Sequence, residues 1–182
     1  MNTQNINESQ TALLLIDIQY FYFPGAKQPL LNPEEASQNA QKLLNHFRDT
    51  GQLVLHVRHN SKTGGEIHKN VAPLETEKVL SKNNVNSFKD TDLLEFLRTN
   101  EIKKLVICGM MTHMCVEAAV RAASDFDFEV TLIQDACTTR ALRFNGKEIP
   151  AEAVHNSTLA SLSGYYAIVM DTKTYLEDFT KQ

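Results

Sequence analysis

The sequence predicts an α/β fold, a three-layer doubly wound sheet of mainly parallel strands with helices on both faces. Two observations lead to this prediction. Several apolar runs lack the alternation with polar residues that a half-exposed strand shows, which indicates parallel strands covered on both faces. These runs alternate with longer amphipathic stretches, and strand–helix–strand alternation is typical of a parallel sheet with crossover helices.

The expected strands are short runs of mostly aliphatic residues. The series opens with TALLLIDIQ, a nearly continuous aliphatic run, and continues in chain order with QLVLHVRH, VLSK, KLVICGM, FEVTLIQDA and YAIVM. These strands span residues 11–19, 52–59, 79–82, 104–110, 128–136 and 166–170.

The expected helices lie between these strands, where apolar residues recur at three- and four-residue intervals. In the first helix, Asn32 is placed to cap the N-terminus, Pro33 to occupy the first turn and Gly51 to end it. Residues 60–81 form an excursion with turn residues at its start. The helices span residues 33–48, a segment from Asp90 or Thr91 to Leu97, and residues 112–126, 151–162 and 172–179.

Length and composition indicate one cytoplasmic domain. Residues 1–10 are expected to be a disordered or frayed tail, and residues 11–182 a single domain with its own core. A net charge of −4 argues against nucleic acid and anionic membranes as partners, and no apolar run reaches the ~18 residues of a membrane helix. Three cysteines, an odd number, and no recognisable secretory signal favour a reducing compartment.

Cys115 ends the turn GMMTHMC (109–115), which a strand enters and a helix leaves. Ligands of doubly wound sheets bind outside the carboxyl ends of the strands, so this turn belongs to the candidate site. The N–H groups and dipole of a helix N-terminus favour a thiolate and can hold an oxyanion. The alternative, a buried cysteine that acts as a small hydrophobe, is about equally well supported here and suits Cys108, inside a strand, better; Cys137 fits either role.

Asp17 and Lys82 are the other charged residues of interest. Asp17 follows the apolar run LLLI, where an unpaired carboxylate is costly, and the end of a strand suits catalysis as well as it suits a turn cap. Gln19 is expected to project to the same side as Asp17 while the chain remains extended. Lys82, in SKNNVNSF, has no local feature that separates it from a solvated lysine.

Three segments together resemble the isochorismatase-like hydrolases, which include nicotinamidases, N-carbamoylsarcosine amidases and ureidoacrylate hydrolases. They are LLLIDIQYFY, SKNNVNSF and CGMMTHMCVEAAVRAASDFDFEVTLIQDACTT, and the resemblance runs from about residue 11 to 171. It implies a triad of Asp17, Lys82 and Cys115 in a homo-oligomer, a dimer or tetramer. It also implies a cis peptide between Met110 and Met111, with the amides of Met111 and Cys115 as the oxyanion hole.

The resemblance implies hydrolysis of a small amide or ureide at its carbon–nitrogen bond, through an acyl-thioester on Cys115 and with no cofactor. The metal motif Asp-x-His of many nicotinamidases is missing from the stretch HVRHN (56–60), so no metal is expected and His56 and His59 are interpreted as polar contacts. Two alternatives stay open: an isochorismatase-type vinyl-ether hydrolase with Asp17 as general acid, and a non-catalytic thiol sensor.

The expected substrate pocket contains Gln19, Phe23 and His113. The aromatic run Tyr20–Phe23 is interpreted equally as core or subunit interface and as the wall of a small pocket. His155 is interpreted as a packing or capping residue. The substrate itself is not readable from the sequence, because specificity resides in loops such as 20–31 and 60–78.

Overall fold

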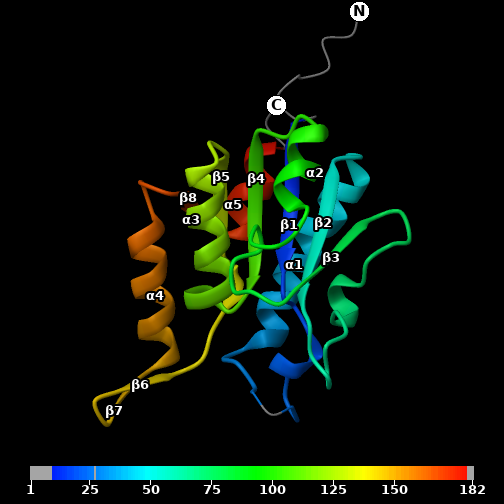
Figure 1. Cartoon of the computed structure of the whole chain (residues 1–182). Helices are drawn as coiled ribbons and strands as arrows, with labels where there is room; N and C mark the ends of the chain where they lie inside the picture. The colour runs from blue at the N-terminus through cyan, green and yellow to red at the C-terminus, as the bar shows by residue number, and fades with distance from the viewer. Residues whose placement is uncertain (1–9, 27, 180–182) are drawn as a thin grey trace, which may run out of the picture.

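Six parallel strands form the central sheet of the computed structural model, which describes residues 10–26 and 28–179 (Figure 1). The strand order is β3-β2-β1-β4-β5-β8, and every neighbouring pair is parallel. This arrangement confirms the predicted doubly wound sheet. The strands are β1 (Thr11–Ile16), β2 (Leu53–His59), β3 (Lys78–Lys82), β4 (Lys104–Met110), β5 (Glu129–Thr138) and β8 (Ile168–Met170).

Helices cover both faces of the sheet. In the view of Figure 1, α1 and α5 lie behind the sheet, while α2, α3 and α4 lie in front of it, so the molecule has three layers. Two single 3-10 turns, η1 (Tyr20–Tyr22) and η2 (Lys69–Val71), lie in the loops after β1 and β2. The helices are α1 (Pro33–Asp49), α2 (Leu93–Thr99), α3 (Glu117–Asp125), α4 (Ala151–Leu162) and α5 (Thr172–Phe179).

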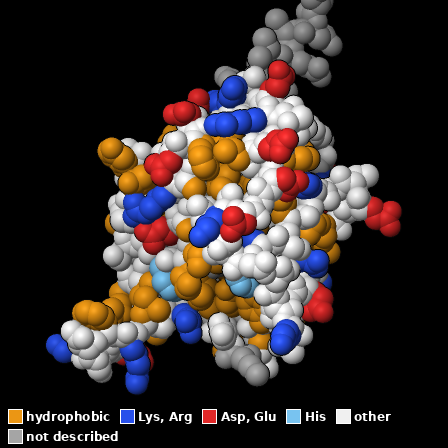
Figure 2. Space-filling model, viewed as in Figure 1, with side chains coloured by type: hydrophobic (Ala, Val, Ile, Leu, Met, Phe, Trp, Pro, Cys, Tyr) orange, Lys and Arg blue, Asp and Glu red, His pale blue; other side chains and the backbone are white. Residues whose placement is uncertain are grey.

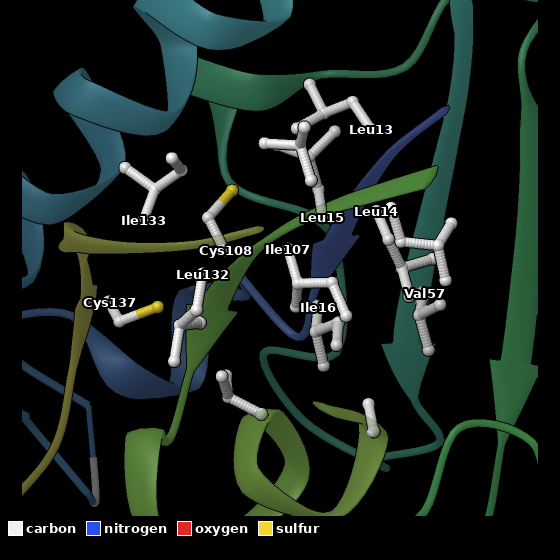
Figure 3. Packing of buried hydrophobic residues seen from close by; sticks show 14 of the residues in the cluster. Leu13, Leu14, Leu15, Ile16, Val57, Ile107, Cys108, Leu132, Ile133 and Cys137 are labelled. Atoms are coloured by element: carbon white, nitrogen blue, oxygen red, sulfur yellow. The ribbon is translucent and has the colours of Figure 1, made fainter. Parts of the chain in front are cut away.

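The core forms around β1, in which all six residues are buried. β1 pairs with β2 on one side and β4 on the other, and helices cover both of its faces, so its residues are at most 6% exposed. Figure 3 shows Leu13 to Ile16 of β1 beside Ile107 of β4 and Val57 of β2. Each fully buried aliphatic side chain contributes about 1.5–3 kcal/mol, which explains why the apolar runs are continuous.

The ends of the first two helices depend on a few polar and left-handed residues. Asn32 occupies the N-cap position of α1, but its side chain makes no capping hydrogen bond. Gly51 follows the helix with φ +68°, a conformation that suits glycine. α2 begins at Leu93 rather than at Asp90 or Thr91, because Asp90 is left-handed (φ 56°) and interrupts any helix through it.

Two other predictions of local structure were wrong, and one element was not predicted. The segment 112–126 is not one α-helix: a π-helical turn, η3 (Thr112–Val116), precedes α3. β1 ends at Ile16, because Asp17 leaves the extended conformation. A hairpin of β6 (Leu142–Phe144) and β7 (Lys147–Ile149) was not predicted, although its turn is Asn145-Gly146 with positive φ at both residues, which is a strong hairpin signal.

The start of the described chain lies at the amino end of β4. Residues 1–9 of the expected N-terminal tail lie outside the described residues, whereas the Gln10 carbonyl accepts hydrogen bonds from the N–H groups of Lys103 and Lys104. Within the described part of the chain, no helix combines the length and the apolar character that a membrane crossing requires.

Candidate active site

The candidate site lies at the topological switch point of the sheet, where the strand order reverses between β1 and β4. β1 is followed by strands on one side of it, and β4 by strands on the other, so a crevice opens at the carboxyl ends of these two strands. Gly109 lets the strands approach there. It has φ +136°, and a Cβ atom at this position would lie 2.0 Å from the Ile16 carbonyl oxygen, so no other residue fits.

Asp17 turns out of β1 at this point. Its backbone is left-handed, with φ 51°, a conformation that is uncommon for residues other than glycine and that often occurs at functional sites. Its N–H donates to the Val57 carbonyl oxygen of β2 at 2.9 Å, which fixes the turn. The Asp17 side chain is fully buried.

Lys82, the last residue of β3, contacts both of the other predicted triad residues, Asp17 and Cys115. Its ammonium group donates to Asp17 Oδ2 at 2.7 Å, to the Asn84 carbonyl oxygen at 3.1 Å and to Cys115 Sγ at 3.3 Å. The side chain is 0% exposed, and three acceptors match the three N–H bonds of an ammonium. A buried pair with this geometry satisfies both charges, whereas either charge alone would be costly.

Cys115 lies on the π-helical turn that follows β4. The Val116 N–H reaches back five residues to the Met111 carbonyl oxygen at 3.3 Å, which widens the turn. The Met110–Met111 peptide is cis, as the resemblance implied. Within the residues that the structure describes, the Met111 N–H donates to no acceptor, so it is available to a ligand.

Burial dominates the electrostatics of the site. It raises the pKa of Asp17, and the charge and hydrogen bond of Lys82 oppose this effect. Burial and the neighbouring carboxylate of Asp17 also raise the pKa of the Cys115 thiol, to about 12, although Lys82 lowers it. Desolvation by burial is the largest of these effects, and it opposes the thiolate that a helix N-terminus was expected to favour.

A cavity of about 810 Å³ opens beside Cys115. All four residues of the aromatic run Tyr20–Phe23 line it, together with Met111 and Met114, so this run forms a pocket wall. Tyr22 and Phe23 also belong to the buried core, and both interpretations of the run therefore apply. The cavity opens at the lower end of the molecule, where Figure 2 shows hydrophobic atoms beside several basic side chains.

The three residues expected in the pocket have different positions. Phe23 lines the cavity and stacks on His68, with ring centroids 3.7 Å apart and planes inclined by 5°. Gln19 lies outside the described lining. Because Asp17 is not extended, the Gln19 amide turns to the backbone instead, bonding to the N–H and carbonyl of His59 and to the Gly65 carbonyl.

His113 and His155 flank the turn that carries Cys115. His113 also lies outside the described lining and is hydrogen-bonded through Nδ1 to Thr139 Oγ1. His155 Nδ1 is hydrogen-bonded to Thr112 Oγ1 at 2.9 Å, so α4 holds the first residue of the π-helical turn. Both histidines therefore bond to residues around the site and do not line its cavity.

His56 and His59 do not point to a common ligand. His56 is buried in β2, and its Nε2 donates to Glu77 Oε2 at 2.9 Å. His59, at the end of the same strand, lines the cavity. Among residues 10–26 and 28–179, no group of three or more histidine, cysteine, aspartate or glutamate side chains is arranged to hold a metal ion.

The Glu77 carboxylate should make stability depend on pH. Burial alone would raise its pKa, but hydrogen bonds from Arg48, the Leu74 N–H and His56 lower it to about 2. A lowered pKa stabilises the fold above the ordinary value of 4.5, and this contribution is lost as the pH falls towards 2. We expect Glu77→Gln to lower the free energy of unfolding at pH 7 by about 1–3 kcal/mol and to flatten its decline below pH 4.5.

Urea unfolding at a series of pH values measures this effect. Glu75→Gln is the matched control, because Glu75 is exposed two residues away and should change stability little. Equal stability of Glu77→Gln and the parent protein at pH 7 would contradict the role of this network.

Sequence reasoning missed Arg140, Met114 and Val85, which also line the cavity. Arg140 comes two residues after β5. The principle that sites lie at the carboxyl ends of strands covers this position, but Arg140 was not among the residues that it was applied to. Val85 and Met114 carry no charge or reactive group that separates them from core residues.

Comparisons with known proteins agree with this geometry. A family model described as the isochorismatase domain matches residues 11–174. The chain is 47% identical over 178 residues to an uncharacterized isochorismatase family protein of Bacillus subtilis, YddQ, covering 92% of this chain and 99% of that protein. Nicotinamidase 3 of Arabidopsis thaliana is 27% identical over 188 residues, covering 91% of this chain and 86% of that protein. A crystal structure of a provisionally named isochorismatase hydrolase from Oleispira antarctica has a TM-score of 0.90 and 44% identity, covering 97% of this chain and 99% of that one.

Proposed function

Because this chain belongs to the isochorismatase family of hydrolases, we propose that it is a cysteine hydrolase that cleaves the carbon–nitrogen bond of a small amide or ureide. The observation that carries the proposal is the buried contact of Lys82 with both Asp17 and Cys115, at 2.7 Å and 3.3 Å. A nucleophile, a base and a cation in mutual contact beside a cavity suit acyl transfer through a covalent intermediate.

The first half of the reaction forms a thioester. Asp17 accepts the proton of the Cys115 thiol, and the charge of Lys82 stabilises the thiolate. The sulfur attacks the carbonyl carbon, and the amides of Met111 and Cys115 donate to the resulting oxyanion. As the tetrahedral species collapses, the carbon–nitrogen bond breaks, and Asp17 returns its proton to the leaving nitrogen. Ammonia or a small amine departs and an acyl-thioester remains on Cys115.

The second half restores the enzyme. Asp17, again ionised, takes a proton from a water molecule, whose oxygen attacks the thioester carbon. Collapse of this second tetrahedral species breaks the carbon–sulfur bond, and Asp17 returns the proton to the Cys115 sulfur. One water molecule is consumed and no electrons are exchanged, so the proposed reaction needs no cofactor or metal.

The high pKa of Cys115 suits this order of events. A resting thiol, rather than a permanent thiolate, avoids placing two anions beside one ammonium in a buried site. It also argues against a thiol sensor, because oxidants react with low-pKa, accessible thiolates. Nicotinamidase 3, a relative by sequence, is named for an amide substrate, which is consistent with this class of reaction.

A second candidate is a vinyl-ether hydrolase in which Asp17 acts as general acid. The specific observation in its favour is the raised pKa of Asp17, since burial favours the protonated carboxyl that such a reaction needs. It leaves Cys115 without a role, and for that reason we rank it second.

We further propose that the enzyme works in the cytoplasm as a homo-oligomer, a dimer or tetramer. Large apolar side chains on the surface support self-association: Phe144 is 69%, Tyr165 83% and Ile168 64% exposed.

A screen for ammonia release tests the proposed reaction. We expect at least one class among small primary amides and ureides to be hydrolysed at a rate well above that of a heat-denatured sample. Activity should survive dialysis against EDTA, because the proposed steps use only Asp17, Lys82, Cys115 and backbone amides. Loss of turnover on chelation and its return with zinc would show that a metal takes part.

A further inference from the structure

His59 lines the cavity together with Cys115 and has no role in the chemistry proposed above. Its position follows from the register of the sheet. Strand β2 lies between β1 and β3, and His59 pairs with Lys82, so these two side chains project from the same face. The Lys82 ammonium group reaches Asp17 from β3 across the end of β2. The imidazole ring therefore lies between the ion pair and the cavity.

The backbone of His59 is held on two sides. The Gln19 amide accepts a hydrogen bond from the His59 N–H at 2.8 Å and donates one to the His59 carbonyl oxygen at 2.9 Å. The next residue, Asn60, donates its N–H to the Lys82 carbonyl oxygen at 2.9 Å. Gln19 is fully buried, so these bonds fix the place of the imidazole ring before any ligand binds. A residue that orients a reactant needs such support.

Two polar atoms at this place are buried without a partner. His59 Nδ1 and Asp17 Oδ1 make no hydrogen bond to any described residue. Asp17 Oδ2 accepts from Lys82, so Oδ1 is the oxygen left to accept a proton. Burial raises the pKa of Asp17, and His59 follows Lys82 and Cys115 among the groups that lower it, so the ring and the carboxylate are neighbours. Unpartnered buried atoms are rare, and a pair of them beside a nucleophile points to a bound reactant.

We propose that His59 is a further catalytic residue, which holds the hydrolytic water together with Asp17. The inference rests on the proposed function, because it concerns the water that attacks the thioester. The water donates one hydrogen bond to Asp17 Oδ1 and the other to His59 Nδ1, which accepts it when the ring hydrogen is on Nε2. The oxygen of the water then faces the thioester carbon on Cys115.

The proton balance of the second half of the reaction stays the same. Asp17 takes one proton as the water oxygen bonds to the thioester carbon. The carbon–sulfur bond then breaks, and this proton passes from Asp17 to the Cys115 sulfur. His59 exchanges no proton and only orients the water. Formation of the thioester depends less on His59, because the leaving nitrogen is positioned by its bond to the substrate, whereas the water is positioned by hydrogen bonds alone.

Rapid-quench kinetics of His59→Leu test this role with the best substrate of the ammonia screen. Leucine fills part of the volume of the ring and accepts no hydrogen bond. We expect a burst of about one ammonia per active site, at a rate within about tenfold of the parent rate. Intact-protein mass spectrometry should then show that water clears the acyl adduct on Cys115 about 10²-fold more slowly than in the parent enzyme. Hydroxylamine attacks a thioester without a general base, so it should clear the adduct at similar rates in both proteins, forming a hydroxamate and the free thiol.

Three further variants separate the lost hydrogen bond from a change in structure. His59→Asn has an amide close to the position of Nδ1 and should recover part of the rate, whereas His59→Gln has its amide closer to the position of Nε2 and should recover less. Arg58→Leu is the matched control, because Arg58 is exposed on the other face of the same strand and does not line the cavity. It should clear the adduct at the parent rate. The size of the burst counts folded sites, so partial misfolding cannot imitate slow clearance.

Failure of this inference and failure of the proposed function give different results. If His59→Leu clears the adduct as fast as the parent enzyme, or if burst and clearance slow by the same factor, the role of His59 is refuted and the hydrolase stands. If His59→Leu gives no burst, the comparison of His59→Asn with His59→Gln decides, and equal clearance by these two variants refutes the role. If the parent enzyme forms no acyl adduct with any amide or ureide, the proposed function is refuted, and this role of His59 with it.

Discussion

Replacing Cys115 with alanine should abolish hydrolysis of the best amide or ureide substrate, with kcat/KM falling by about 10⁴-fold or more. In the proposed reaction the sulfur forms the bond that replaces the carbon–nitrogen bond, and a positioned water seldom replaces a covalent route without a loss of several orders of magnitude. The fold should tolerate the change, because Cys115 is small and its removal leaves the Asp17–Lys82 ion pair intact. Kinetics of ammonia release and urea unfolding measure the two effects.

Cys108→Ala is the control for the loss of a buried thiol. Cys108 is fully buried in β4 and does not line the cavity, so its removal should cost some stability and little activity. Asp17→Asn should also be inactive, because it removes the group that moves every proton in the proposed reaction.

The same variants distinguish the amidase from the vinyl-ether hydrolase. Rapid acid quench followed by intact-protein mass spectrometry should detect an acyl adduct on the parent enzyme and none on Cys115→Ala. A vinyl-ether hydrolase would keep most activity in Cys115→Ala, would lose it in Asp17→Asn and would form no adduct. Near-normal turnover of Cys115→Ala without an adduct would therefore reject the amidase mechanism.

The sheet could be predicted from the sequence because strands that are buried on both faces have uninterrupted runs of apolar residues. The run at residues 11–16 lies at the centre of the sheet, so every position is apolar or small. The hairpin at residues 142–149 has the opposite environment: its side chains are largely exposed, and a hydrophobic pattern gives no signal there. The Asn-Gly turn, by contrast, is a local signal from which the hairpin could have been predicted.

The site could be predicted only in part, for a similar reason. Asp17 and Cys115 were noticed because a strand ends beside each of them. Lys82 has no such local feature, and its role depends on the pairing of β3 with β2, which places the end of β3 one strand away from the end of β1 at the same edge of the sheet. The helix N-terminus favoured a thiolate at Cys115, but position along a helix says nothing about the depth of burial, which has the largest effect on the pKa of this thiol.

Replacing Lys82 with methionine should lower kcat/KM by about 10³-fold, more than its effect on folding would suggest. Methionine keeps an unbranched apolar stem of similar length but removes the charge that Asp17 and Cys115 share. The pKa of Asp17 is now raised by burial and lowered by Lys82, so without the lysine burial acts unopposed and the carboxyl is protonated to a higher pH. The acidic limb of kcat/KM should accordingly move to higher pH.

A protonated Asp17 also explains why the variant should still fold. Breaking a buried ion pair usually costs about 3–5 kcal/mol because one charge is left unpaired, but neutralising the carboxyl recovers part of that loss. The double variant Asp17→Asn/Lys82→Met should therefore be no less stable than Lys82→Met alone. Lys78→Met on the same strand is the matched control: its ion pair with Asp92 is partly exposed, so the change should cost at most about 1 kcal/mol and leave kcat/KM unaltered. An unchanged kcat/KM and pH profile in Lys82→Met would remove Lys82 from the catalytic site.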